Sequence, residues 1–142
     1  MIVLDTSVLV AALIETHKFH GPSVELFRNV RKGRPKGGLC IHSLAELYSA
    51  LTNYPSEPRL PPSVAEKMIT ENISSSLQVI ELSPTDYRLA IKRVTGLNFR
   101  GGAVYDSLIL QAAIKKRAEA LYTWNRPDFD RLAGKEMKIL EP

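Results

Sequence analysis

The acidic residues that could do chemistry in this sequence stand at the ends of predicted strands or in the first turns of predicted helices. They are Asp5, Glu46, Asp106 and Asp128. A charged carboxylate beside a buried strand is costly unless it has a partner. In open parallel α/β sheets, ligands bind at the carboxyl ends of the strands, where such residues would meet. The pattern therefore predicts that several acids converge at one edge of a sheet.

Clustered carboxylates need a counter-charge, because each negative charge raises the pKa of its neighbours. No His or Cys accompanies these acids, so the ligands on offer are oxygens, which suit Mg²⁺ or Mn²⁺. Such an ion can activate water and stabilise the charge that develops when a phosphodiester is cut in line. The acids thus favour a metal-dependent phosphodiester hydrolase.

Each acid also has a structural alternative. Asp5 and Asp128 could N-cap the helices that follow them. Glu46 stands three residues after Ser43, which is the spacing of a capping box. Asp106 could complement the dipole of its helix. No single acid decides between the two interpretations, and the joint pattern favours a shared site.

Five short apolar segments without clean alternation are predicted to be strands covered on both faces. They occupy 1–5, 38–42, 77–82, 120–124 and 137–140. Helical segments separate most of them, which is typical of an α/β sandwich with a mostly parallel central sheet. We therefore expect a three-layer α/β/α fold that places the ends of the strands together.

The helix starts are readable from capping patterns. Capping-box spacing occurs at Ser43 with Glu46 and again at Ser63 with Glu66. Ser83, followed by Pro84 and Asp86, reads as the N-cap of a third helix.

Two helices are expected to turn an apolar face inward. One carries Ala90, Ile91 and Val94, and the other, spanning about 105–116, carries Leu108, Ile109, Ala112 and Ala113. The Pro-rich stretch 53–62 reads as a helix–helix connection and not as a linker, so we expect a single domain over 1–142.

The composition fits a globular protein and excludes two classes. Of 142 residues, 44% are apolar and 24% charged, with a net charge of +4, which is not the composition of a disordered chain. No segment is long and apolar enough for a membrane span, and no basic region precedes the first apolar residues as in a signal peptide. We expect a cytoplasmic protein without a membrane partner, in which Cys40 is a buried, inert thiol.

Four blocks of the sequence, taken in order, resemble the PIN-domain ribonucleases and, within them, the VapC-type toxins of toxin–antitoxin pairs. The blocks read MIVLDTSVLVAAL, CIHSLAELYSALTNYP, GGAVYDSLILQAAIKK and LYTWNRPDFDRL. Together they span residues 1–140. The resemblance implies a small α/β/α sandwich and a Mg²⁺- or Mn²⁺-dependent endoribonuclease.

The resemblance also implies roles for particular residues. Asp5, Glu46 and Asp106 would bind the metal, and either Asp128 or Asn125 would complete the site, since many PIN domains carry a fourth acid where this chain has Asn125. Around them, hydroxyls could hydrogen-bond a carboxylate, a water or a phosphate. These are Thr6, Ser7 and Thr123.

Partners follow from the same resemblance and from charge. RNA is the implied substrate, and Arg100 and Arg126 are the best placed for phosphate contacts because they adjoin the acids in sequence. The basic stretch 27–38 and Lys115–Arg117 are weaker candidates. A VapB-like antitoxin that blocks the acids and a homodimer are also implied.

Two other functions remain open from the sequence. Asn125 in place of an acid would suit a PIN-fold binding module that has lost catalysis. A haloacid-dehalogenase-like phosphatase would carry a second Asp two residues after the first, and that position is Ser7.

Overall fold

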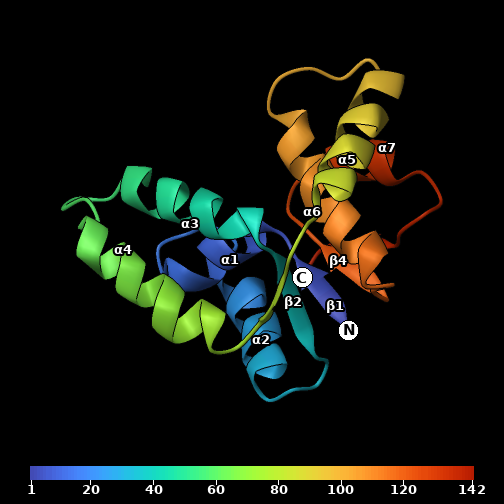
Figure 1. Cartoon of the computed structure of the whole chain (residues 1–142). Coiled ribbons are helices and arrows are strands. Elements are labelled where there is room, and N and C mark those ends of the chain that lie inside the picture. Colours follow the sequence, from blue (N-terminus) through green and yellow to red (C-terminus); the bar gives the residue numbers. More distant parts are fainter.

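A five-stranded parallel sheet forms the centre of the computed structural model, which describes residues 1–142 (Figure 1). The strands are β1 (Ile2–Leu4), β2 (Gly37–Cys40), β3 (Gln78–Ile80), β4 (Ala120–Tyr122) and β5 (Ile139–Leu140). Their order across the sheet is β3-β2-β1-β4-β5, and every neighbouring pair is parallel. All five predicted strands are therefore confirmed, each slightly shorter than its sequence pattern.

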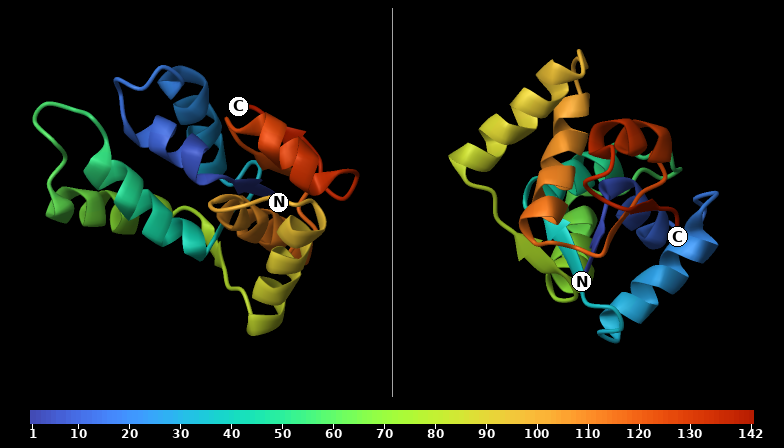
Figure 2. Two further views of the ribbon diagram at one scale, coloured as in Figure 1. Left: turned by 90° about the horizontal axis from the view of Figure 1, so that it is seen from above. Right: turned by 90° about the vertical axis from the view of Figure 1, so that its right-hand side faces the viewer.

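Helices cover both faces of the sheet. They are α1 (Thr6–Leu13), α2 (His20–Arg31), α3 (His42–Asn53), α4 (Pro62–Met68), the π-helix η1 (Ile69–Ser74), α5 (Pro84–Gly96), α6 (Ala103–Lys115) and α7 (Arg126–Ala133). The first five helices lie on one side and α5, α6 and α7 on the other (Figures 1 and 2). None of them has the length and apolar composition that a membrane span requires.

Side-chain alternation along β1 explains the three layers. Ile2 and Leu4 point into an apolar cluster with α1, α2, α3 and η1. Val3 points to the opposite face, into a second cluster with α5, α6 and α7. Because successive side chains of a strand face opposite ways, this fully buried strand supplies both cores. The predicted three-layer α/β/α architecture is confirmed.

Two of the predicted capping boxes are absent. α3 begins at His42 after Ile41, and no side chain caps it; the Ser43 hydroxyl is buried without a hydrogen-bond partner. α4 begins at Pro62 and also lacks a side-chain cap, because Ser63 already lies inside the helix. In both cases the helix starts two residues earlier than its Ser-x-x-Glu pattern predicts.

The third predicted start is confirmed. Ser83 caps α5 and accepts a hydrogen bond from the Asp86 amide at 3.2 Å, while Asp86 accepts one from the Ser83 amide at 2.8 Å. The predicted inward face of α5 is wrong at Ile91, which is 51% exposed while Ala90 and Val94 are buried. A helix of 3.6 residues per turn carries position 91 away from the stripe that contains 90 and 94.

Three smaller expectations are confirmed. Leu108, Ile109, Ala112 and Ala113 of α6 are all buried. The stretch 53–62 joins α3 to α4. Cys40 is fully buried, and burial raises the pKa of its thiol to about 11, so the thiolate is scarce at neutral pH.

Candidate functional site

The sheet order creates a switch point at β1. From β1 the chain moves outward in one direction to β2 and β3, and β4 and β5 lie on the other side. Ligands of open α/β sheets bind at the carboxyl edge near such a point. Asp5 directly follows β1 and Thr123 directly follows β4, and these two strands are hydrogen-bonded neighbours. Glu46 on α3 and Asp106 in the first turn of α6 approach the same edge.

Asp5 is buried, with only 4% of its surface exposed. Its Oδ2 accepts hydrogen bonds from Ser7 Oγ at 2.6 Å and from Thr123 Oγ1 at 2.8 Å. Asp5 holds the N-cap position of α1, as the capping alternative predicted, but its side chain makes no capping hydrogen bond to that helix. Burial raises the pKa of Asp5, and hydrogen bonds from the hydroxyls of Ser7 and Thr123 oppose that rise without cancelling it. Capping alone therefore does not account for this buried carboxylate.

Glu46 is tied to the start of α1 and not to its own helix. Its Oε2 accepts a hydrogen bond from Thr6 Oγ1 at 2.9 Å. Burial raises the pKa of Glu46; the Thr6 bond and the His42 imidazole lower it, and the Asp5 charge raises it further. The Thr6 hydrogen bond spans 40 residues of sequence and holds the carboxylate of Glu46 beside the residue that follows Asp5.

Asp106 is the most perturbed member of the group. Burial raises its pKa first, and the negative charges of Asp5, Glu46 and Asp128 add to the rise, which brings it to about 7. Only Asn125 Nδ2, which donates to Asp106 Oδ2 at 3.3 Å, opposes it. The four predicted acids therefore interact electrostatically, and no cationic side chain pairs with Asp5, Glu46 or Asp106.

The segment after β4 links two of the acids. Thr123 Oγ1 donates to Asp5 while accepting a hydrogen bond from the Asn125 amide at 2.9 Å. Ser7 Oγ, the other donor to Asp5, accepts from the Trp124 amide at 3.1 Å. One turn of chain therefore orients both Asp5 and, through the Asn125 side chain, Asp106.

Asp128 lies beside this group on α7 and is exposed. Asn125 holds the N-cap position of α7, so the capping alternative for Asp128 is wrong. With Asp106 and Arg100 it lines a cleft of about 540 Å³. The same cleft contains Arg131, a cation that sequence reasoning did not select. Its guanidinium carbon lies 4.2 Å from the centre of the Phe99 ring, a contact that only the fold reveals.

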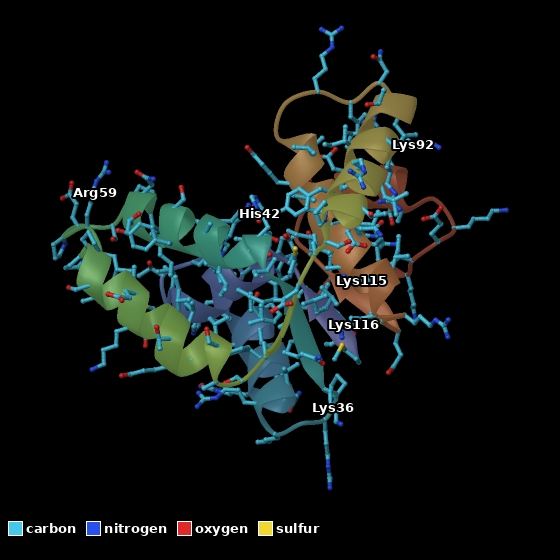
Figure 3. The ribbon with its side chains drawn as sticks, in the orientation of Figure 1. Lys36, His42, Arg59, Lys92, Lys115 and Lys116 are labelled. Atoms are coloured by element: carbon cyan, nitrogen blue, oxygen red, sulfur yellow. The ribbon has the colours of Figure 1, made fainter.

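The other predicted phosphate contacts divide between the two edges of the sheet. Arg126 is exposed near the acids and pairs with Asp130 at 3.2 Å. Lys36 precedes β2 and Lys116 precedes β4, so the basic stretches lie at the amino edge, opposite the acids (Figure 3). Because all strands are parallel, residues immediately before a strand lie at the amino edge and cannot line the carboxyl edge directly. Lys115 is already paired, 2.7 Å from Asp86.

The donor set suits a hard divalent ion of the Mg²⁺ type. No group of three or more His, Cys, Asp or Glu side chains is arranged here so that it could hold a metal ion. Mg²⁺ does not require such a cage, since it keeps several waters and binds through one or two carboxylates. Partly desolvated carboxylates with mutually raised pKa values and oxygen-only ligands match that preference.

A parallel sheet lies between two layers of helices, and a group of acids gathers at its carboxyl edge beside β1. These features define a class of α/β proteins with an acidic site. Residues 2–135 match the PIN domain family, and the chain belongs to that family. The recognition made from the four sequence blocks is thereby confirmed.

Relatives in this family carry ribonuclease names. The chain is 36% identical to ribonuclease VapC27 of Mycobacterium tuberculosis strain H37Rv over 117 residues, covering 82% of this chain and 79% of that protein. It is 33% identical to ribonuclease VapC40 of the same organism over 110 residues, covering 77% and 75%.

Solved structures share the fold over the whole chain. The M. tuberculosis VapC20 toxin, described as cleaving the sarcin–ricin loop, matches with a TM-score of 0.76 at 18% identity, with full coverage of both chains. VapBC2 from Rickettsia felis, bound to a promoter DNA fragment, matches with a TM-score of 0.67 at 20% identity over 100% of this chain and 99% of that one.

Proposed function

We propose that this chain is a divalent-metal-dependent endoribonuclease and the toxin of a VapBC-type pair. The observation that carries the proposal is the group of Asp5, Glu46 and Asp106, which are oriented by hydroxyl and amide donors and lack a cationic partner. Such an arrangement is unfavourable in a purely structural role, and it is what a catalytic metal requires. Homologues named as ribonucleases support the same activity.

Asp5, Glu46 and Asp106 would hold Mg²⁺ or Mn²⁺, one or two of them as direct ligands and the rest through the waters of the ion. The bound ion would supply an activated water and stabilise the charge that develops on the phosphate. Thr123 and Ser7 hold Asp5 in place by donating to one of its oxygens, which leaves the other oxygen for a ligand. The side-chain amide of Asn125 already donates to Asp106. We therefore assign Asn125 to orienting that carboxylate and Asp128 to completing the acidic group.

Arg100 is the side chain we assign to the RNA backbone. It lines the cleft that contains Asp106 and Asp128, where a guanidinium can hold a phosphate against an otherwise repulsive surface. Arg126 could bind an RNA phosphate only after leaving its ion pair with Asp130. A VapB-like antitoxin would cover this acidic edge, and a homodimer is the assembly that we expect.

The first test is cleavage of structured RNA by wild type, Asp5→Asn and Glu66→Gln, each with Mn²⁺, Mg²⁺ or EDTA. Glu66 is the control, because it is an exposed carboxylate on α4 that lines a different cleft with Tyr48 and Pro62. We expect metal-dependent cleavage by wild type and by the control variant, and none by Asp5→Asn.

An enzyme with a narrow substrate range could leave the test RNA intact, so metal binding is also measured by calorimetry. A wild-type protein that leaves RNA intact and binds neither ion would overturn the proposed function. Cleavage that survives EDTA or the Asp5→Asn change would equally remove the metal site from the mechanism.

A further inference from the structure

Two stacked rings connect α3 to α6 beside the acidic residues. The rings of His42 and Tyr105 lie 4.8 Å apart between centroids, at an interplanar angle of 17°. His42 is the first residue of α3 and Tyr105 the third of α6. Figure 3 shows His42 at the end of α3 that faces α6. The pair therefore stands where the two acid-bearing helices come together.

Both rings are close neighbours of the acids. Tyr105 immediately precedes Asp106, and His42 is four residues before Glu46, so it shares a face of α3 with that carboxylate. The electrostatic effect of His42 on Glu46 agrees with this placement. The stack therefore lies within one helical turn of each of these two carboxylates.

Tyr105 stands beside Asp106 with 46% of its surface exposed. An aromatic ring that stays exposed retains apolar surface that a second flat ring could still bury by stacking. The His42 ring supports one side of Tyr105 and fixes its plane without covering the residue.

A second aromatic group near the acids shows what a structural stack looks like here. Phe19 and Trp124 stack with centroids 4.0 Å apart, and both are partly buried. The Trp124 indole N–H donates to Ser23 Oγ at 2.9 Å, and the Lys18 amine lies 4.6 Å from the Phe19 ring centre. These contacts use the rings internally, unlike the exposed ring of Tyr105.

We propose that Tyr105, backed by His42, binds one unpaired nucleobase of the RNA next to the phosphate that is cut. This inference rests on the proposed ribonuclease function and deepens it. Aromatic rings stack on any base, because every base has a π-face. A base held there must be unpaired, so the stack selects single-stranded or looped RNA without specifying its sequence. Tyr105 is thus a positioning residue, which places the adjoining phosphate against Asp106.

The binding test uses oligoadenylate that carries the fluorescent base 2-aminopurine at successive positions, mixed with the Asp5→Asn protein so that no RNA is cut. We expect the fluorescence of one position to be quenched by stacking. The quench should vanish in Tyr105→Ala and persist in Tyr105→Phe. Tyr48→Ala is the matched control, since Tyr48 lies on α3, is 43% exposed and lines a different cleft with Pro62 and Glu66.

The kinetic test compares wild type and Tyr105→Ala on a cleavable RNA and on the same RNA lacking the stacked base. We expect Tyr105→Ala to lower kcat/KM by about 5- to 150-fold, mostly through KM, and to have little effect on the abasic RNA. A purely structural stack would weaken cleavage of both RNAs equally.

The proposal is overturned if quenching survives in Tyr105→Ala, if no position is quenched, or if Tyr105→Phe behaves like Tyr105→Ala. A wrong assignment of the ribonuclease function would give a different set of results. In that case the wild type would cut neither RNA, although the binding test would still report whether a base stacks on Tyr105.

Discussion

Asp86 and Asp106 are the same residue type in the first turns of two helices that pack together, yet their environments are opposite. Asp86 receives a hydrogen bond and a positive charge from Lys115, and further hydrogen bonds from Ser83 and Gln111. These hold the pKa of Asp86 well below its usual range, with the Lys115 contact as the largest cause. Asp106 has one amide donor, and its pKa rises to about 7.

The difference separates a carboxylate that stabilises the fold from one that the fold must hold against repulsion. Asp86 closes the capping box of α5 and ties α5 to α6 through Lys115. Asp106 faces other negative charges and forms neither a capping box nor an ion pair that would stabilise the fold. Because strain of this kind is typically retained for function, the two residues should respond to substitution in opposite ways.

The largest expected effect is the loss of cleavage in Asp106→Asn. Metal ions contribute several kcal/mol to such reactions, so we expect a fall of about 10³-fold in kcat/KM. The melting temperature without metal should stay the same or rise, because the substitution removes a repelled charge. RNA cleavage assays and thermal denaturation in EDTA measure the two effects.

Glu66→Gln provides the control, since that exposed residue of α4 should change neither quantity. If Asp106→Asn were to lower the melting temperature strongly in EDTA, the residue would be structural and the contrast with Asp86 would fail.

The second effect in size is the loss of stability in Asp86→Ala. Removing a charged acceptor of several hydrogen bonds should lower the free energy of unfolding by about 2–3 kcal/mol. Urea denaturation measures it, and cleavage per folded molecule should be unchanged. A variant that remains as stable as wild type would mean that the Lys115 pair contributes little in water.

The strands and the acids were predictable from sequence because their signals are local. The apolar runs overlap the strands and end at most two residues past them, and Asp5 directly follows β1. The capping box at 83–86 was also recovered, since all its hydrogen bonds lie within four residues. Local sequence is sufficient wherever the interaction partners are near in the chain.

The contacts that distinguish the acids were not predictable in the same way. Glu46 matched a capping box with Ser43, but its partner is Thr6, 40 residues earlier. Lys115 looked like a surface cation for RNA, but it pairs with Asp86, 29 residues earlier. Such partners are selected by how helices pack, which no local spacing encodes, and the stacking of His42 on Tyr105 has the same origin.

A third and smaller effect is stabilisation by metal. Mn²⁺ at ten times its Kd should stabilise wild type by about 1.4 kcal/mol, since ligand binds the folded state only, and raise its Tm by about 3–6 °C. The shift should persist in Asp86→Ala and disappear in Asp106→Asn. An equal shift in all three proteins would indicate an ion bound elsewhere.

The smallest effect is the pH dependence that Asp86 confers. Its pKa is lower in the folded state than in the unfolded chain, so its contribution to stability is complete above about pH 4 and is lost as pH falls through the folded value. We therefore expect the stabilities of wild type and Asp86→Ala to differ most near pH 6 and to converge only as the pH falls well below about 4, toward the depressed folded-state pKa of Asp86. Urea denaturation at a series of pH values measures this, with Asp130→Ala as the control. A gap that stays constant with pH would mean that Asp86 stabilises the fold through packing, not through its charge.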